Sequence, residues 1–211
     1  MINYLIRLHL PDRPGALGAV ASRIGSVGGD VGSIEILERR DGAVVDELGV
    51  GLPGDHLLDL LRAEILEVDG VAIECLRSVE GALPDRHAEL LDVAAELFKQ
   101  RSSATLLDRL TALVRKSLAA DFTAVLDTDT SRILSSDGRP PEPEALNAMA
   151  RQAMSPPPYS VGRDDVVAAA HLIQSDLVLI VGRLEPMLRD RERQWISIMA
   201  EIADDGCQRP A

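Results

Sequence analysis

The chain has 211 residues, which suits one large domain or two small ones, and its composition is that of an ordinary globular protein. Its formal net charge of -12 opposes binding to nucleic acid and to anionic lipid heads, and aromatic residues make up only 2% of it. No apolar run reaches the roughly 20 residues of a membrane helix, and no signal peptide is recognised. We therefore expect a cytosolic protein with no nucleic-acid or membrane partner.

The first part of the chain, residues 1–84, predicts the order β-α-β-β-α-β. An Asp-Gly pair at 41–42 is a hairpin signal, and the first strand is expected to be half-buried, with Leu5, Arg7 and His9 on its outer face. Four strands with two helices on one face form the ferredoxin-like split β-α-β arrangement. The strands are expected at residues 3–10, 31–37, 43–52 and 71–79, and the helices at 17–27 and 58–65.

Residues 85–211 predict an α+β domain in which helices flank two β-hairpins. Proline runs at 140–143 and 156–158 bracket its third helix, because proline cannot continue a helix. Helices are expected from an N-cap at Asp85, from an N-cap at Ser103, over 144–154, and from near Pro186 with Leu188, Trp195 and Met199 on one stripe. Strands are expected at 122–126, 132–135, 166–172 and 177–182. The two cysteines, Cys75 and Cys207, are expected to be free thiols.

The string from Leu10 to Val20, with Gly29-Asp30-Val31-Gly32-Ser33-Ile34 about a helix length later, resembles the signature of the ACT domain. The resemblance spans residues 2–80 and is closest to ACT modules attached to amino-acid biosynthetic enzymes. It implies a regulatory module that binds a free amino acid at a dimer interface. The family often has Asn where this chain has Asp30, so a carboxylate there either favours a ligand amine or caps a turn.

Residues 85–205 resemble a GAF domain more loosely. The resemblance is carried by the helix that ends in Ala119-Ala120-Asp121, the strand at 122–126, the strand at 177–182 with Arg183, and the closing segment 189–195. It implies a GAF-like sensor module.

The turn from Asp12 to Leu17 carries chemistry suited to an amino acid. With Pro14 expected as the first helical residue, the N–H groups of Ala16, Leu17 and Gly18 point out of the helix start, where they attract a carboxylate. Gly15 lets a ligand approach the backbone, and Asp12 can accept a hydrogen bond from an ammonium group. Spacing alone also fits a turn in which Asp12 only caps the helix, but the resemblance favours the ligand.

Two further residues are expected near this turn, Asp30 and Val31, at the start of the second strand. Arg13 either pairs with the ligand carboxylate or faces solvent. The candidate ligand-binding set is therefore Asp12, Arg13, Pro14, Gly15, Ala16, Leu17, Asp30 and Val31.

Other polar residues have simpler explanations. His9 is interpreted as a half-exposed sheet residue, and His171 as a hydrogen-bonded structural histidine rather than a pocket residue. Cys75 is assigned to the buried face of its strand, which it is expected to share with Val71 and Ile73. Three acidic residues near the predicted hairpin indicate a solvated turn rather than a cation site: Asp127, Asp129 and Asp137.

We therefore expect a non-catalytic regulatory protein, and the preference for arginine over lysine indicates a bacterial source. Two N-terminal domains align their sheets edge to edge in a homodimer, an amino acid bridges them, and the helix at 85–100 carries the change onward. No cofactor or metal is expected. The alternative is an interaction subunit that dimerises and docks on a metabolic enzyme without binding an amino acid.

Overall fold

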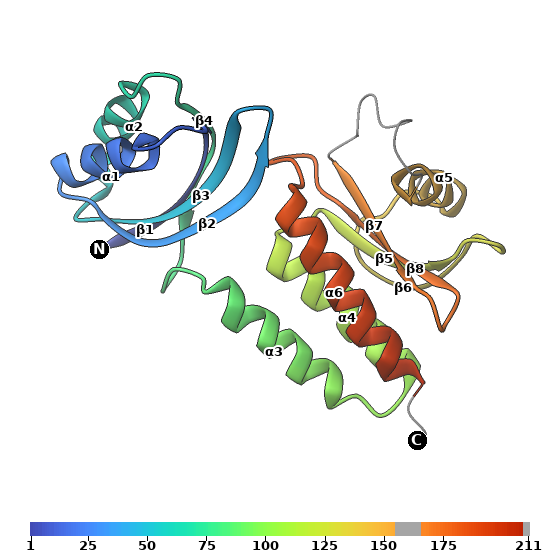
Figure 1. Ribbon diagram of the computed structural model, residues 1–211. Helices are drawn as coiled ribbons and strands as arrows, with labels where there is room; N and C mark the ends of the chain where they lie inside the picture. The colour runs from blue at the N-terminus through green and yellow to red at the C-terminus, as the bar shows by residue number, and fades with distance from the viewer. Residues whose placement is uncertain (155–165, 209–211) are drawn as a thin grey trace. The chain divides into compact units, whose positions relative to one another are not determined.

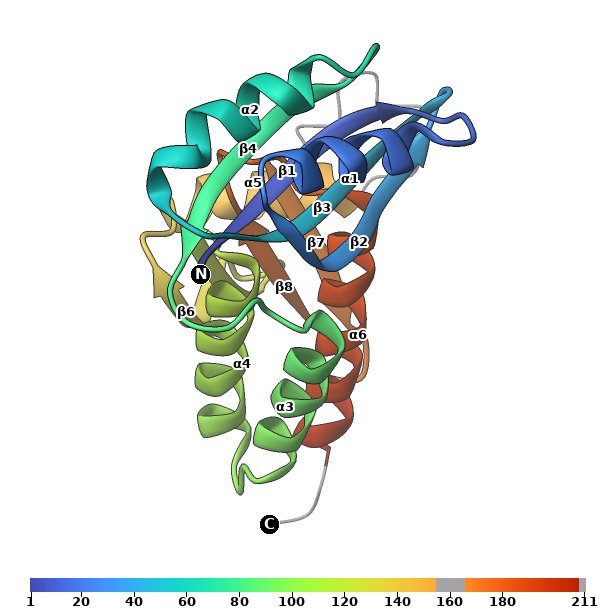
Figure 2. The same ribbon diagram turned by 90° about the vertical axis from the view of Figure 1, so that its left-hand side faces the viewer.

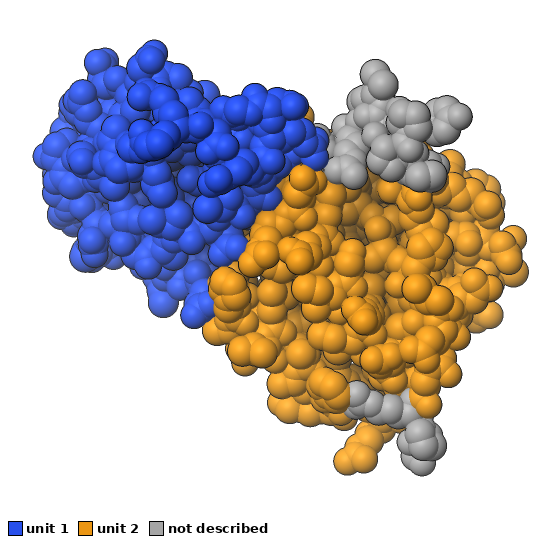
Figure 3. All heavy atoms as spheres, in the orientation of Figure 1, with its two compact units in different colours: residues 1–85 blue, residues 86–211 orange. Residues whose placement is uncertain are grey.

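The computed structural model describes residues 1–154 and 166–208. The chain forms two compact units, residues 1–85 and 86–211 (Figures 1 and 3). The proline run at 156–158 lies outside the described residues.

The first unit is a four-stranded antiparallel sheet in the order β2-β3-β1-β4, with α1 and α2 on one face (Figure 2). Its elements are β1 (Ile2–Pro11), α1 (Ala16–Ser26), β2 (Asp30–Arg40), β3 (Ala43–Leu52), the 3-10 turn η1 (Asp55–Leu57), α2 (Leu58–Leu66) and β4 (Ala72–Val79). This arrangement confirms the predicted ferredoxin-like βαββαβ fold.

Strand β1 is buried on both faces, so the prediction that it is half-buried is wrong. Leu5 and Arg7, on the face away from the helices, are 4% and 2% exposed. Arg7 is accommodated because its Nη2 lies 2.9 Å from Oε2 of Glu47, which is directly opposite on β3. The inner face holds the expected alternating residues of β1, Tyr4, Ile6, Leu8 and Leu10, against Val20 and Ile24 of α1 and Leu61 and Ile65 of α2.

The second unit has a four-stranded antiparallel sheet in the order β6-β5-β8-β7, which confirms the α+β class and both predicted hairpins. Its elements are α3 (Arg86–Phe98), α4 (Ser103–Leu118), β5 (Phe122–Asp127), β6 (Arg132–Gly138), α5 (Pro143–Met154), β7 (Val167–Leu172), β8 (Leu177–Gly182) and α6 (Asp190–Cys207).

Helices cover both faces of this second sheet. Leu146 and Ala150 of α5 pack with Phe122 and Ile180 on one face. On the other face, the Thr123 hydroxyl of β5 donates to the Thr111 carbonyl of α4 at 2.8 Å. Helices α4 and α6 pack side by side there, and α3 packs against both. No helix within the described residues is long and apolar enough to span a membrane.

Two helix starts differ from prediction, each because of a side-chain cap. The N-cap of α4 is Ser102, not Ser103, since its side chain accepts from the Thr105 N–H. Helix α6 begins at Asp190 rather than near Pro186, because Oε2 of Glu192 accepts the backbone N–H of Arg189 at 2.9 Å. Leu188 is therefore buried ahead of the helix rather than on its stripe.

The segment between β8 and α6 is held by a buried ion pair. Arg183 and Glu192 are 4% and 2% exposed, and Nη2 of Arg183 lies 2.8 Å from Oε2 of Glu192. The Arg183 guanidinium also donates to the carbonyls of Leu118, Pro186 and Met187 at 2.7, 2.6 and 3.0 Å. Because both charges are paired and hydrogen-bonded, their burial is tolerated and the start of α6 is fixed.

Candidate functional site

The candidate ligand site is the turn that joins β1 to α1. The Asp12 N–H donates to the Gly42 carbonyl at 2.8 Å, which ties this turn to the hairpin between β2 and β3. Gly15 has a left-handed φ of 89°, and no atom lies within 4 Å of the place where a Cβ would stand. Since glycine adopts this conformation without steric cost, the turn presents open backbone at the start of α1.

The donors at this helix start differ in part from prediction. Helix α1 begins at Ala16, so Pro14 is not its first residue, because the left-handed Gly15 stands between them. The Ala16 N–H is not free, since it donates to the Arg13 carbonyl at 3.3 Å. Among the described residues, the N–H groups of Leu17 and Gly18 have no hydrogen-bond acceptor. Two amides thus remain to attract an anion.

Charged side chains from two elements meet beside the turn. Oδ1 of Asp12 lies 3.7 Å from Nη1 of Arg39, near the end of β2. The interpretation of Asp12 as an N-cap is wrong, because Gly15 occupies that position and no side chain caps α1. Arg13 is exposed, and its Nη2 lies 3.5 Å from the Asp69 carbonyl. The turn therefore carries both signs of charge as well as the two free amides.

Asp46 is a buried carboxyl group that sequence reasoning missed. It lies opposite Leu8 of β1 and Ile36 of β2, so it shares the sheet face that bears the helices. Asp46 is 3% exposed, and its Oδ1 has no hydrogen-bond partner within the described part of the chain. Burial raises the pKa of Asp46, and nearby Arg39 partly opposes that rise. The position of Asp46, next to Glu47 within the otherwise apolar run at 43–52, is the signal that could have identified it.

Asp30 and Val31 do not lie near the Asp12 turn of the same chain, so that expectation is wrong. Asp30 is opposite Gly51 of β3, which in turn is opposite Asn3 at the start of β1. Asn3 and the Asp12 turn lie at opposite ends of β1. The start of β2, which is level with Asn3, is therefore roughly 25 Å from the Asp12 turn at 3.3 Å per residue. Asp30 is exposed, and Val31 packs against the core.

Cys75 does not share the face of Ile73, contrary to the prediction. The register of β4 shifts at a β-bulge, so that Cys75 lies opposite Arg7 while Ile73 lies opposite Leu8. The extra residue, Glu74, changes the face on which every later side chain of β4 lies. Cys75 is consequently half-buried on the outer face of the sheet as a free thiol.

The two strand histidines differ in their contacts. Nε2 of His9 lies 3.2 Å from Oε2 of Glu74 on the neighbouring strand. The His171 side chain is exposed on β7 and makes no hydrogen bond with the described residues, so the interpretation of a hydrogen-bonded structural histidine is wrong.

Two of the three acidic residues near the β5–β6 hairpin, Asp127 and Asp129, form a turn as interpreted. Oδ1 of Asp127 accepts the N–H groups of Asp129 and Thr130 at 2.9 and 3.1 Å. Hydrogen bonds from Thr130 hold the pKa of Asp127 below its usual value. Asp137 pairs instead with Nε of Arg115 at 2.6 Å. Within residues 1–154 and 166–208, no three His, Cys, Asp or Glu side chains are grouped to hold a metal ion.

Neither a protein-family model nor a curated protein matches the chain. Among solved structures, an ACT domain protein from Streptococcus pneumoniae is similar to it at 17% identity, with a TM-score of 0.31, over 39% of this chain and 98% of that one. The GAF domain of a phosphoenolpyruvate-protein phosphotransferase from Acinetobacter is similar at 12% identity, with a TM-score of 0.41, over 58% and 92%.

A third similar structure is an unknown protein from Galdieria sulphuraria, at 14% identity and a TM-score of 0.34. The match covers 45% of this chain and 64% of that one, so this chain spans less than two thirds of that protein. The α+β class of the chain follows from its own two antiparallel four-stranded sheets and the helices that flank them.

Proposed function

We propose that the chain is a cytosolic, non-catalytic regulatory protein whose first unit binds a free amino acid between two copies of the chain. The observation that carries this proposal is the open turn at Gly15, which bears the free amides of Leu17 and Gly18 and, from Asp12, a carboxylate that lies 3.7 Å from the Arg39 guanidinium. Amides and a guanidinium suit a carboxylate, and a carboxylate suits an ammonium group, so the turn is chemically matched to a zwitterion.

The edge of the first sheet supports a dimer. Strand β2 has 11 residues and lies at one end of the strand order, so its outer backbone groups have no neighbouring strand in the first unit. Ile34 and Ile36 on it are each 48% exposed. A long edge strand with exposed apolar residues is prone to pair with another strand. A second copy of β2 is the partner we propose.

An antiparallel pairing of two β2 strands would also join the separated parts of the candidate site. Because β2 runs from Asp30 to Arg40, each strand would begin beside the end of the other. Asp30 of one copy would then approach the Asp12 turn of the second copy, since Arg39 pairs with Asp12 there. The ligand would thus contact both chains, and its binding would favour one arrangement of the dimer.

Helix α3 is the element that we propose passes this change to the second unit. It begins at Arg86, seven residues after β4 ends at Val79, and packs against α4 and α6. The effect on the second unit cannot exceed the difference in ligand affinity between the two dimer arrangements.

The test is a thermal-unfolding screen of the full chain against the twenty amino acids. A ligand present at a hundredfold its Kd adds about 2.7 kcal/mol to the free energy of unfolding, which raises Tm by several degrees. We expect one or two amino acids to stabilise the wild type but not Asp12→Ala. Glu67→Ala is the matched control, because it removes one exposed carboxylate elsewhere in the first unit.

Stabilisation of Asp12→Ala equal to that of the wild type would place the ligand elsewhere. No stabilisation of a folded, dimeric wild type by any amino acid would overturn the sensor proposal. That second result would favour an interaction subunit that docks on a metabolic enzyme, and co-purification would then be used to find that enzyme.

A further inference from the structure

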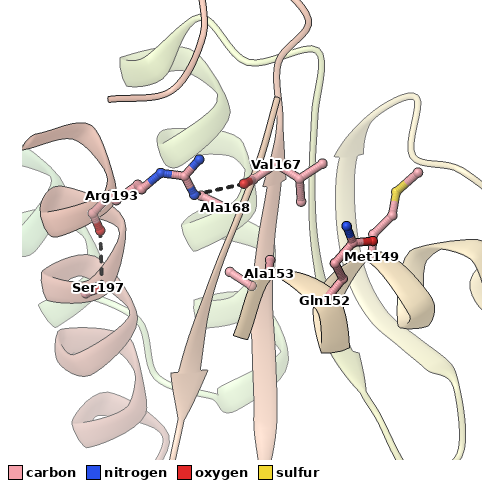
Figure 4. Close-up of a pocket in the computed structure, with 8 residues that line it drawn as sticks. Met149, Gln152, Ala153, Val167, Ala168, Arg193 and Ser197 are labelled. Carbon is pink, nitrogen blue, oxygen red and sulfur yellow. Dashed lines mark hydrogen bonds between the residues drawn. The ribbon is translucent and has the colours of Figure 1, made fainter. Parts of the chain in front are cut away.

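A pocket in the second unit is bordered by α5, β7 and α6 and has a volume of about 240 Å³ (Figure 4). Much of its lining is exposed to solvent, including Met149, Gln152, Ala153 and Ser197. Nη1 of Arg193 donates to the Val167 carbonyl at 2.9 Å. Among the described residues that line this pocket, none is a buried polar side chain that lacks a hydrogen-bond partner. A group of that kind lies in the first unit instead.

The buried carboxyl group of Asp46 lies close to a charged residue of the candidate amino-acid site. Arg39 of β2 is opposite Val44 of β3, so Arg39 and Asp46 are diagonal neighbours on the sheet face that bears the helices. Diagonal neighbours are about 7–8 Å apart, a separation that a long side chain can span. Arg39 is thus within reach of Asp46, while its Nη1 lies 3.7 Å from Oδ1 of Asp12.

Asp46 has an unused capacity for a partner. It is 3% exposed, and its Oδ1 accepts no hydrogen bond within the described part of the chain. Because an unpaired buried carboxylate is costly, it attracts a nearby guanidinium or takes up a proton. The positive charge of Arg39 stabilises the carboxylate and so opposes the rise in the pKa of Asp46 that burial causes.

The other charged groups around Asp46 are few. The residues of β1 on this face are Tyr4, Ile6, Leu8 and Leu10, and those of β2 are Val31, Ile34, Ile36 and Arg39. The Tyr4 hydroxyl donates to Asp55. The charged residue of α1 is Arg23, whose Nη1 lies 2.8 Å from Oε2 of Glu64 on α2. Arg39 is therefore the charge that acts on Asp46, and Asp12 and Arg13 of the turn lie beyond it.

We propose that Asp46 is a positioning residue that controls whether Arg39 is available to the carboxylate of a bound amino acid, an inference that rests on the function proposed above. A charged Asp46 holds the guanidinium against the sheet. A proton taken from solvent by Asp46 releases the guanidinium, which then pairs with the ligand carboxylate at the turn. Ligand binding and proton uptake by Asp46 therefore favour each other.

This coupling fixes the sign of the pH dependence. Because the complex holds a proton on Asp46 more tightly than the free protein does, the affinity for the amino acid rises as pH falls. Protonation of Asp12, which is proposed to accept from the ligand ammonium group, has the opposite effect. Tighter binding at lower pH is therefore a signature of Asp46 and not of Asp12.

The first arm of the experiment needs no ligand. The full chain is labelled with 13C at its aspartate carboxyl carbons, and the titration of Asp46 is followed by NMR, with its signal assigned by its loss in Asp46→Asn. We expect Arg39→Gln to raise the pH at which Asp46 titrates by about one pH unit, because a nearby positive charge is lost. Arg40→Gln is the matched control and should leave this titration unchanged, since Arg40 lies opposite Ala43 on the other face of the sheet.

The second arm applies the panel of twenty amino acids to the full chain in thermal unfolding at about pH 7.5 and about pH 4.5, both above the usual pKa of an aspartate. Titration calorimetry then gives the Kd of each amino acid that stabilises the wild type. We expect binding to be about three- to tenfold tighter at the lower pH. Asp46→Asn should bind no more tightly at the lower pH than at the higher. His9→Asn should keep the wild-type dependence, because His9 lies opposite Val45 on the other face of the sheet.

The outcomes separate this inference from the proposed function. An Asp46 titration that Arg39→Gln leaves unchanged would overturn the role of Asp46, and so would a wild-type affinity that does not rise as pH falls. An equal rise in Asp46→Asn would overturn it as well. Each of these results leaves the amino-acid site in place. If no amino acid stabilises the wild type at either pH, the proposed function is wrong, and the role of Asp46 in ligand binding is wrong with it.

Discussion

Two glycines of the candidate turn should respond to the same substitution with opposite signs. Gly15 N-caps α1 with a φ of 89°, whereas Gly18 lies inside the helix. No atom lies within 4 Å of the Cβ position at either glycine, so an added methyl group meets no steric obstacle. The effect of alanine at each position therefore comes from the backbone conformation alone.

The magnitudes follow from those conformations. Alanine at Gly15 must adopt the left-handed region, which costs about 1–2 kcal/mol. Alanine at Gly18 has the better helix propensity and should stabilise the first unit by about 0.5–1 kcal/mol. The two variants should therefore differ by about 2 kcal/mol in the free energy of unfolding of that unit.

Native-state hydrogen exchange of the β1 amides is the appropriate measurement. Ile6 and Leu8 are fully buried at the centre of the first unit, so their amides exchange through unfolding of that unit whatever the second unit does. Gly15→Ala should speed their exchange and Gly18→Ala should slow it. A neutral Gly15→Ala, or the same sign for both variants, would refute the left-handed turn and with it the geometry of the candidate site.

Three further predictions concern buried charge and the sheet edge. Glu192→Ala leaves Arg183 buried without its counter-ion and should lower the free energy of unfolding by about 3–5 kcal/mol. Urea unfolding, followed by the fluorescence of Trp195, the single tryptophan, measures this loss. A loss under about 1 kcal/mol would contradict the prediction. Burial raises the pKa of Asp46 from its usual 3.8. Just above pH 3.8 the folded state therefore binds more protons than the unfolded state. The free energy of unfolding consequently falls as the pH rises through the pKa of the folded state. Asp46→Asn should remove this slope of up to about 1.4 kcal/mol per pH unit. Urea unfolding over a series of pH values should then show that the stability of the variant increases relative to that of the wild type as pH rises. Ile36→Lys should convert the proposed dimer into a monomer, and the monomer should remain folded because Ile36 is 48% exposed. Sedimentation measures the oligomeric state. A dimer that this charge leaves unchanged would exclude the β2 edge as the dimer interface.

The first unit was predictable because its local signals agree with one another. The alternation along β1 matches the inner face of the sheet, and the Asp41-Gly42 pair forms the predicted hairpin with φ values of 54° and 77°. Two successive left-handed residues are what a two-residue hairpin requires, and Asp-Gly adopts them readily.

The prediction errors arose where a residue's position depends on contacts with another part of the chain. The bulge at Glu74 adds one residue to β4 relative to β1, and no pattern within β4 alone records which strand it pairs with. The burial of Arg7 depends on Glu47, which lies on a different strand. Helix α6 starts at Asp190 because Glu192 caps the backbone ahead of it, although apolar spacing is compatible with an earlier start.

The chemistry of the candidate site was predictable from the sequence, but only some of its residues were. Asp12 and the helix start were found from one local motif, and both belong to the turn between β1 and α1. Arg39 and Asp46 reach the same region from β2 and β3, so the pairing of the strands is needed to place them at this site.

The proposed sharing of the site between two chains has a consequence that separates it from any site within one chain. Asp12→Ala and Asp30→Ala should each abolish the amino-acid response as homodimers, because each proposed site takes Asp12 from one chain and Asp30 from the other. In a heterodimer of the two variants, one site carries both substitutions and the other carries neither. Mixing equal amounts should therefore restore about a quarter of the wild-type binding capacity, measured by titration calorimetry, since half of the dimers regain one of two sites. No recovery in a mixture shown to exchange chains would mean that the two aspartates do not complete one site across the dimer.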